Sequence, residues 1–148
     1  MPGRWPYEEP GPLSLRVLWA GLETYDMTRD PRDNAITPVN GLNFEQEVLR
    51  ADLPVLIDVS ATWCAPCKAA HPVVLALARA NPGRLKVVQI DGGESPELVE
   101  RLGVRGFPTF LGVSGGDVVA RRVGFGGRRP LEELANSLLA LNSREASV

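Results

Sequence analysis

The sequence contains few cysteines and histidines, the side chains that most often bind zinc. Its 148 residues include only two cysteines, Cys64 and Cys67, and one histidine, His71. These three could supply part of a zinc site, but a fourth ligand is not apparent. We therefore expect no metal. On this interpretation His71 is a partly exposed helix residue whose charge tunes its surroundings. The alternative is that the cysteines are structural or form half of a zinc site.

The sequence also lacks a strong net charge and a long apolar run. The net charge of −2 gives no strong field to attract nucleic acid or a membrane surface. No stretch approaches the roughly 18 apolar residues of a membrane-spanning helix. Residues 1–10 carry acids where a signal peptide has a basic start. We expect a cytoplasmic protein with no nucleic-acid or membrane partner, and in a reducing compartment two cysteines are more often catalytic than structural.

The composition is that of a soluble globular protein, with 44% hydrophobic and 23% charged residues. Residues 1–34 form an extension rich in proline and aromatic residues, in which Leu13 to Tyr25 fits either a helix or a strand. We interpret it as a loosely docked extension, and the alternative is a partner-binding arm. Residues 35–142 form one domain, and we expect residues 143–148 to be a frayed C-terminal tail.

Hydrophobic periodicity within the domain predicts alternating strands and helices. The continuous apolar run over residues 53–60 indicates a central strand buried on both faces. Ser114-Gly115-Gly116-Asp117 is a hairpin signal. The predicted strands are 36–40, 53–60, 85–91, 109–113 and 118–123, and the predicted helices are 43–51, 66–81, 96–102 and 130–141. The order β-α-β-α-β-α-β-β-α indicates an α/β fold, with a mixed sheet and helices on both faces.

Single residues predict how these helices begin and bend. Asn43 can cap the first helix, which would then bury Phe44, Val48 and Leu49. Ser95 can cap the helix that Pro96 opens and Gly103 closes. Pro72 lies inside the helix over residues 66–81, where it removes a backbone hydrogen bond, so we expect a kink.

The two cysteines lie at the turn from the central strand into the next helix. Residues 63–68 read Trp-Cys-Ala-Pro-Cys-Lys, a spacing typical of redox motifs. Backbone N–H groups and the helix dipole stabilise a thiolate on Cys64, which suits an attacking sulfur. Pro66 has no N–H and leaves the other donors of the first turn free. Cys67, about one turn further, can attack a mixed disulfide formed at Cys64.

Asp58 lies within the apolar run that precedes the cysteines. Burying a carboxylate is costly unless it is paired or serves the chemistry. Desolvation should raise the pKa of Asp58, which suits a proton acceptor for Cys67. The alternative is a solvent-exposed aspartate at the end of a strand.

From about Ile36 to Leu141 the sequence resembles thioredoxin. Four features in register carry this resemblance: the Trp63–Lys68 motif, Asp58 before it, the segment Gly106-Phe107-Pro108-Thr109, and Val123-Gly124 ahead of a terminal amphipathic helix. Three positions depart from the usual residues of the family. Ala65 replaces a glycine, Ser60 a tryptophan and Gln89 a lysine that neighbours the buried acid. We expect these departures to influence the reduction potential, and Gln89 to leave the pKa of Asp58 higher than in a lysine-bearing relative.

The resemblance implies a thioredoxin fold and a protein disulfide reductase. Cys64 attacks a substrate disulfide, Cys67 resolves the intermediate with Asp58 accepting its proton, and a redox-active Cys64–Cys67 disulfide remains. Pro108 is expected to be cis, in a loop where the backbone of Phe107 and Thr109 pairs with an extended substrate. The residues that the resemblance places against the substrate are Trp63, Ala65, Pro66, Phe107, Pro108, Thr109 and Gly124.

The resemblance further implies a monomer that binds no cofactor. Its partners are disulfide-containing protein substrates and a thioredoxin reductase, which supplies reducing equivalents from NADPH. Two alternatives remain. Residues 61–67 also resemble the TlpA-like thiol oxidoreductases, which suggests an oxidase or isomerase. The other alternative is a non-catalytic binding module built on a thioredoxin fold.

Overall fold

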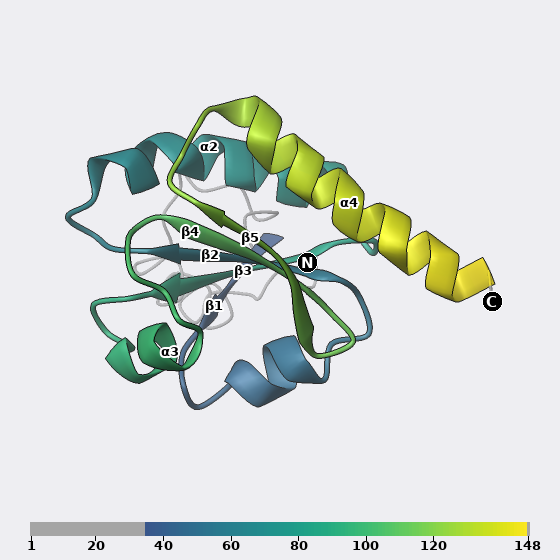
Figure 1. The fold of residues 1–148 in the computed structure, drawn as a ribbon, viewed down its shortest axis with the longest axis horizontal. Coiled ribbons are helices and arrows are strands. Elements are labelled where there is room, and N and C mark those ends of the chain that lie inside the picture. Colours follow the sequence, from purple (N-terminus) through teal and green to yellow (C-terminus); the bar gives the residue numbers. More distant parts are fainter. Residues whose placement is uncertain (1–34, 148) are drawn as a thin grey trace, which may run out of the picture. The chain divides into compact units, whose positions relative to one another are not determined.

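The computed structural model describes residues 35–147 of the chain. The predictions for the N-terminal extension lie outside the described residues. The predicted order of elements is confirmed (Figure 1): β1 (Ile36–Val39), η2 (Glu45–Leu49), β2 (Val55–Ser60), α2 (Ala65–Ala80), β3 (Lys86–Asp91), α3 (Pro96–Arg101), β4 (Thr109–Ser114), β5 (Asp117–Val123) and α4 (Arg128–Ser147). No helix in this part of the chain is both long enough and apolar enough to cross a bilayer.

The five strands form one mixed sheet in the order β1-β3-β2-β4-β5. β3 pairs in parallel with β1 and β2, whereas β4 is antiparallel to both β2 and β5. All six residues of β2 are buried, as its continuous apolar run predicts. The turn between β4 and β5 contains Gly115 and Gly116 at φ +59° and +87°, conformations that glycine adopts without strain. The predicted hairpin is therefore confirmed.

Each face of the sheet has its own hydrophobic core, because side chains alternate between the faces along a strand. On one face Leu56 and Phe110 pack with buried residues of α2 and α4. On the other face Ile57 and Val59 pack with Phe44, Val48 and Leu98, which come from the η2 and α3 regions. Helices therefore cover both faces of the sheet, as expected (Figure 1).

The first helix differs from its prediction. Its backbone is π-helical, and the Arg50 N–H donates to the Glu45 carbonyl. Asn43 does not cap it, because its side chain accepts from the Asn40 N–H and donates to the Pro38 carbonyl. Phe44 and Val48 are buried as predicted, but Leu49 is exposed. The π-helical turn carries Leu49 away from the face that an α-helical period would place inward.

Two further helix predictions differ from the structure, one in a cap and one in a boundary. Ser95 precedes Pro96 as predicted, but its side chain makes no capping hydrogen bond. The last helix was expected to end at Leu141, yet α4 continues to Ser147. Residues 142–147 contain neither glycine nor proline, so nothing in their sequence stops the helix.

Candidate active site

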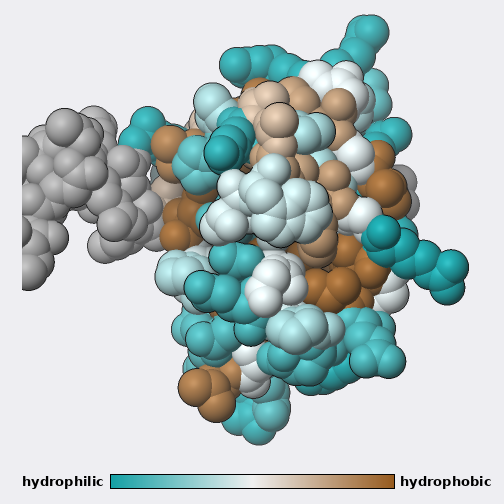
Figure 2. Space-filling model, turned by 90° about the vertical axis from the view of Figure 1, so that its left-hand side faces the viewer, coloured by the Kyte–Doolittle hydropathy of each residue, from teal (hydrophilic) through white to brown (hydrophobic). Residues whose placement is uncertain are grey.

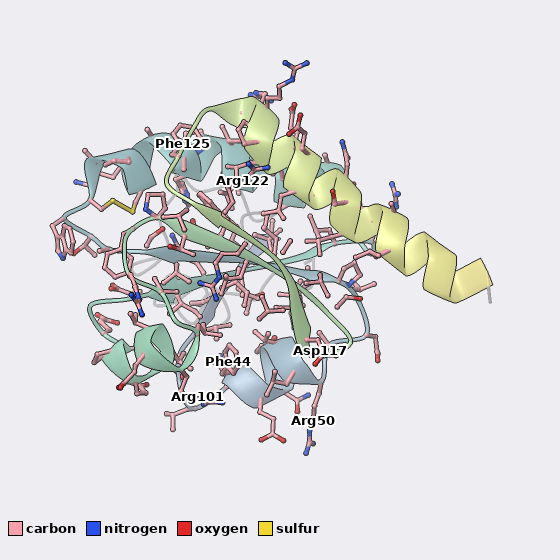
Figure 3. All side chains as sticks on the ribbon, in the orientation of Figure 1. Phe44, Arg50, Arg101, Asp117, Arg122 and Phe125 are labelled. Atoms are coloured by element: carbon pink, nitrogen blue, oxygen red, sulfur yellow. A yellow bond between two sulfur atoms is a disulfide. The ribbon has the colours of Figure 1, made fainter. Side chains whose placement is uncertain are left out.

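Cys64 and Cys67 form a disulfide at the N-terminal end of α2 (Figure 3). Their Cα atoms lie 5.3 Å apart. Cys64 is the N-cap residue, and its Sγ accepts a hydrogen bond of 3.2 Å from the Cys67 N–H. The same N–H would stabilise a thiolate on Cys64 after reduction. Both cysteines are only 5% exposed, so this hydrogen bond distinguishes the two sulfurs whereas burial does not.

Aromatic and proline residues surround the disulfide on the side of β4. Trp63 is 74% exposed, and its ring lies edge-on to Phe107 with the centroids 5.7 Å apart. Phe107 is half-buried and packs against the cysteine pair. A Cβ atom at Gly92 would lie 2.5 Å from the Phe107 ring, so the position of this ring requires glycine there. Exposed apolar surface is visible on this end of the molecule (Figure 2).

The loop before β4 contains the cis Phe107–Pro108 peptide bond, as predicted. Pro108 is buried, and its carbonyl accepts a 2.8 Å hydrogen bond from the Gly124 N–H. This bond brings Pro108 and Gly124 together, and Gly124 adopts φ +82°. Ala65 and Pro66 are exposed in the first turn of α2.

Thr109 lies differently from its predicted place against the substrate. It is fully buried, pairs with Val59 of β2 and Val123 of β5, and its hydroxyl donates to the Gly106 carbonyl. Strands on both sides leave its backbone no free edge for a substrate strand. The backbone of Thr109 is therefore not available to pair with a substrate strand, contrary to the prediction.

Asp58 is buried under the start of α2, because β2 places it on the same face of the sheet as Leu56. Burial raises the pKa of Asp58 from 3.8 to about 6, the expected direction. Opposing this rise are a hydrogen bond from Ser60, the charge of His71 and a hydrogen bond from Gln89. A carboxyl that titrates near neutral pH can take up and release a proton during a reaction.

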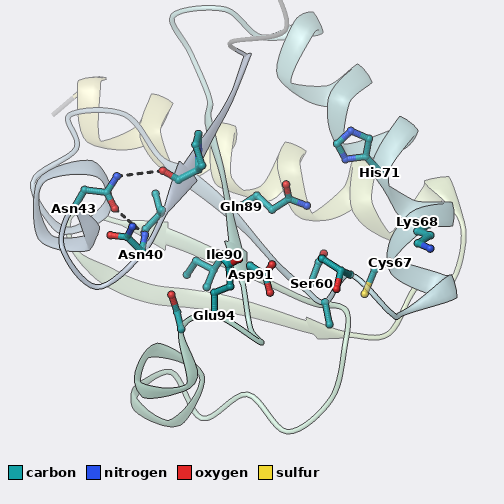
Figure 4. A pocket seen from close by; sticks show the side chains of 15 residues that line it. Asn40, Asn43, Ser60, Cys67, Lys68, His71, Gln89, Ile90, Asp91 and Glu94 are labelled. Atoms are coloured by element: carbon teal, nitrogen blue, oxygen red, sulfur yellow. Dashed lines mark hydrogen bonds between the residues drawn. The ribbon is translucent and has the colours of Figure 1, made fainter. Parts of the chain in front are cut away.

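A groove of about 520 Å³ opens beside the disulfide (Figure 4). It is bordered by Cys67 and His71 of α2, by Ser60 at the end of β2, and by Gln89 and Asp91 of β3. It continues to Asn40 and Asn43 beyond the end of β1. We call this cavity the α2 groove. No group of three or more histidine, cysteine, aspartate or glutamate side chains in the described residues could hold a metal ion.

Ser60 and Gln89 join the site as hydrogen-bond partners of Asp58. The resemblance to thioredoxin already implies that Gln89 lies beside the buried acid, whereas the sequence assigns Ser60 no role at Asp58. The alternation of β2 places residues 58 and 60 on one face, and this pattern was the available signal for Ser60. Gln89 pairs with Asp58 across neighbouring strands, the position beside the buried acid that the resemblance implies.

Several known proteins are similar to this chain in sequence. The thioredoxin family model matches residues 35–140. A thioredoxin from Pseudomonas aeruginosa is 44% identical over 89 residues, covering 60% of this chain and 82% of the relative. Thioredoxin 1 from a Nostoc species is 40% identical over 91 residues, covering 62% and 85%. A thioredoxin from Porphyra purpurea is 34% identical over 106 residues, covering 72% and 99%. The chain therefore belongs to the thioredoxin family.

Proposed function

We propose that this protein reduces disulfide bonds in other proteins by dithiol–disulfide exchange at Cys64 and Cys67. The observation that carries the proposal is the cysteine pair at the N-terminus of α2, with a buried carboxyl of raised pKa beneath it. The two sulfur atoms carry the two electrons themselves, so the exchange needs no bound cofactor.

The two sulfur atoms take different parts in the exchange. The Cys64 thiolate attacks one sulfur of the substrate disulfide and releases the other as a thiolate. Cys67 then loses its proton, with Asp58 as the final acceptor, and attacks Cys64. The Cys64–Cys67 bond forms and the substrate leaves as a second thiolate. The Cys67 N–H bond to the Cys64 sulfur supports this assignment, because it favours the thiolate on Cys64.

The substrate contacts lie on the side of the disulfide that faces β4. Exposed Trp63 and half-buried Phe107 offer an apolar surface beside the sulfur atoms. Ala65 and Pro66 extend this surface along the first turn of α2, and Gly124 extends it beyond Pro108. An extended substrate segment fits here by pairing with the backbone at Phe107.

Regeneration requires an external reductant. The protein's partner is a thioredoxin reductase that supplies electrons from NADPH, and the chain acts as a monomer in the cytoplasm. The cytoplasm suits this cycle, because thiols stay reduced there and the dithiol form of the protein would persist. Sedimentation of the purified protein and fractionation of the source cells test the monomer and the location.

An insulin-reduction assay tests the proposed function. We expect the protein to accelerate precipitation of the insulin B chain in dithiothreitol. We also expect it to couple NADPH oxidation to insulin reduction when a thioredoxin reductase is added. No acceleration with dithiothreitol would contradict the disulfide reductase function. Acceleration with dithiothreitol but not with NADPH and several thioredoxin reductases would contradict the proposed electron source alone.

A further inference from the structure

The buried carboxyl of Asp58 is held by one strong and one weak hydrogen bond. The Ser60 hydroxyl donates to Asp58 Oδ1 over 2.5 Å. The Gln89 side-chain amide approaches Oδ2 at 3.5 Å, the long limit for such a bond. Asp58 is 1% exposed and Ser60 is 7% exposed, so this pair is almost wholly removed from solvent.

The α2 groove reaches Asp58 through these same two partners. Ser60 and Gln89 both border the groove, and so does Cys67 (Figure 4). Of the two cysteines, both in the described part of the chain, only Cys67 borders it. At about 520 Å³ the groove has ample room for water, and the polar side chains of Ser60, Gln89 and Asp91 on its wall offer hydrogen-bond partners. The groove thus connects the resolving sulfur, the Ser60 hydroxyl and solvent.

The groove and the substrate surface lie on opposite sides of β2. In the sheet, β3 and β1 follow β2 on one side, and they supply Gln89, Asp91 and Pro38 to the groove. On the other side β4 and β5 follow, and they carry the Phe107–Pro108 loop and Gly124. A substrate bound against Trp63 and Phe107 would therefore leave the groove open to water.

Charged groups of both signs surround the route from the groove to Asp58. From α2 come Lys68 and His71, and from the end of β3 and the following loop come Asp91 and Glu94. From β4, the residue paired with Asp58 is the apolar Phe110. His71 is the charged neighbour that acts most on Asp58, and it favours the ionised carboxylate.

We propose that Ser60 is a positioning residue that relays the Cys67 proton from a groove water to Asp58. The proposal rests on the proposed function, because it concerns the step in which Cys67 resolves the mixed disulfide. In that step the Cys67 S–H gives its proton to a water in the groove. The water passes a proton to Ser60 Oγ as the Ser60 hydroxyl proton moves to Asp58 Oδ1.

The remaining bonds then change without another reactant. The Cys67 thiolate attacks Cys64, the Cys64–Cys67 bond forms, and the bond from Cys64 to the substrate sulfur breaks. The two cysteines lose two electrons, and the substrate disulfide has gained them as two thiolates. The proton on Asp58 returns through Ser60 to the groove, on the side that the substrate leaves uncovered.

A single-turnover reaction with a chromogenic aryl disulfide, dithiobis(nitrobenzoate), separates the two chemical steps. The first coloured thiolate leaves when Cys64 attacks, and the second leaves when Cys67 resolves. We expect the second phase of the wild type to rise with pH through about 6 and then level off, because Asp58 must be ionised. We expect Ser60→Ala to lower the rate of the second phase about tenfold at about pH 7.5, where the wild-type rate no longer changes with pH. The rate of the first phase should be unchanged.

Ser60→Thr and Ser60→Val form a matched pair that differs in the hydroxyl. Thr should restore the second phase to within about twofold of the wild type, whereas Val should behave as Ala does. Both suit a β-strand, so this pair also serves if Ser60→Ala fails to fold. The relay would be overturned if the Ala and Val variants reached the same second-phase rate as the wild type at high pH and differed only in the pH midpoint. Failure of the wild type to release either thiolate would instead contradict the proposed function.

Discussion

Replacing Cys64 with serine is expected to abolish insulin reduction, with a loss of about 1,000-fold or more. A serine hydroxyl at this position has no thiolate form to attack a disulfide at neutral pH. The measurement is the initial rate of insulin precipitation in dithiothreitol, with the uncatalysed rate subtracted. Cys64 is the N-cap of α2, and serine is also a good N-cap, so the variant should fold.

Cys67→Ser provides the matched comparison for this result. It keeps the Cys64 nucleophile, so it should still react once with an aryl disulfide although its insulin turnover is lost. Cys64→Ser should not react with the aryl disulfide at this rate. Its remaining thiol, Cys67, serves to resolve the mixed disulfide and not to attack the substrate. A Cys64→Ser protein that retains more than about a tenth of the activity would show that Cys64 is not the attacking residue.

The second large effect is on stability, and it comes from the buried carboxyl. Because the pKa of Asp58 in the folded protein is raised from 3.8 to about 6, the folded state binds a proton more tightly than the unfolded state. The stability that this proton binding adds to the folded state is fully present below pH 3.8 and is lost as the pH rises through about 6. The loss amounts to roughly 3 kcal/mol at neutral pH.

Asp58→Asn removes this cost of ionisation while keeping a side chain of the same size. We expect the oxidised variant to be more stable than the oxidised wild type by roughly 3 kcal/mol above about pH 7, and by little below about pH 4. Urea unfolding of both proteins across this pH range measures the difference. A difference that does not change with pH would contradict a raised pKa. The same variant should slow the Cys67 step about 100-fold, because the final proton acceptor is gone.

Much of the fold could be predicted from sequence, because local patterns and distant motifs agree. The continuous apolar run of β2 requires a strand covered on both faces, and the structure buries all of it. The spacing of Cys64 and Cys67 needs only one helical turn to bring the sulfur atoms together. These features depend on short stretches of chain, so the sequence alone could place them.

Other parts of the site depend on contacts that the sequence does not show. The pairing of Asp58 with Gln89 follows from the register between β2 and β3, so residue patterns do not show it and only the resemblance to thioredoxin indicates it. Thr109 was predicted to contact the substrate because the sequence does not show that strands pair with it on both sides. Asn43 had two sets of backbone partners within reach, and helix propensity could not decide between them.

Trapping the covalent intermediate tests the central claim most directly, namely that Cys64 attacks and Cys67 resolves. Reduced Cys67→Ser protein is mixed with an excess of a disulfide-containing protein such as insulin, quenched with acid and examined by non-reducing mass spectrometry. The account predicts a mixed disulfide with the substrate chain attached at Cys64, and none from Cys64→Ser under the same conditions. A complex that forms with Cys64→Ser and maps to Cys67, or the absence of any complex with Cys67→Ser, would contradict it.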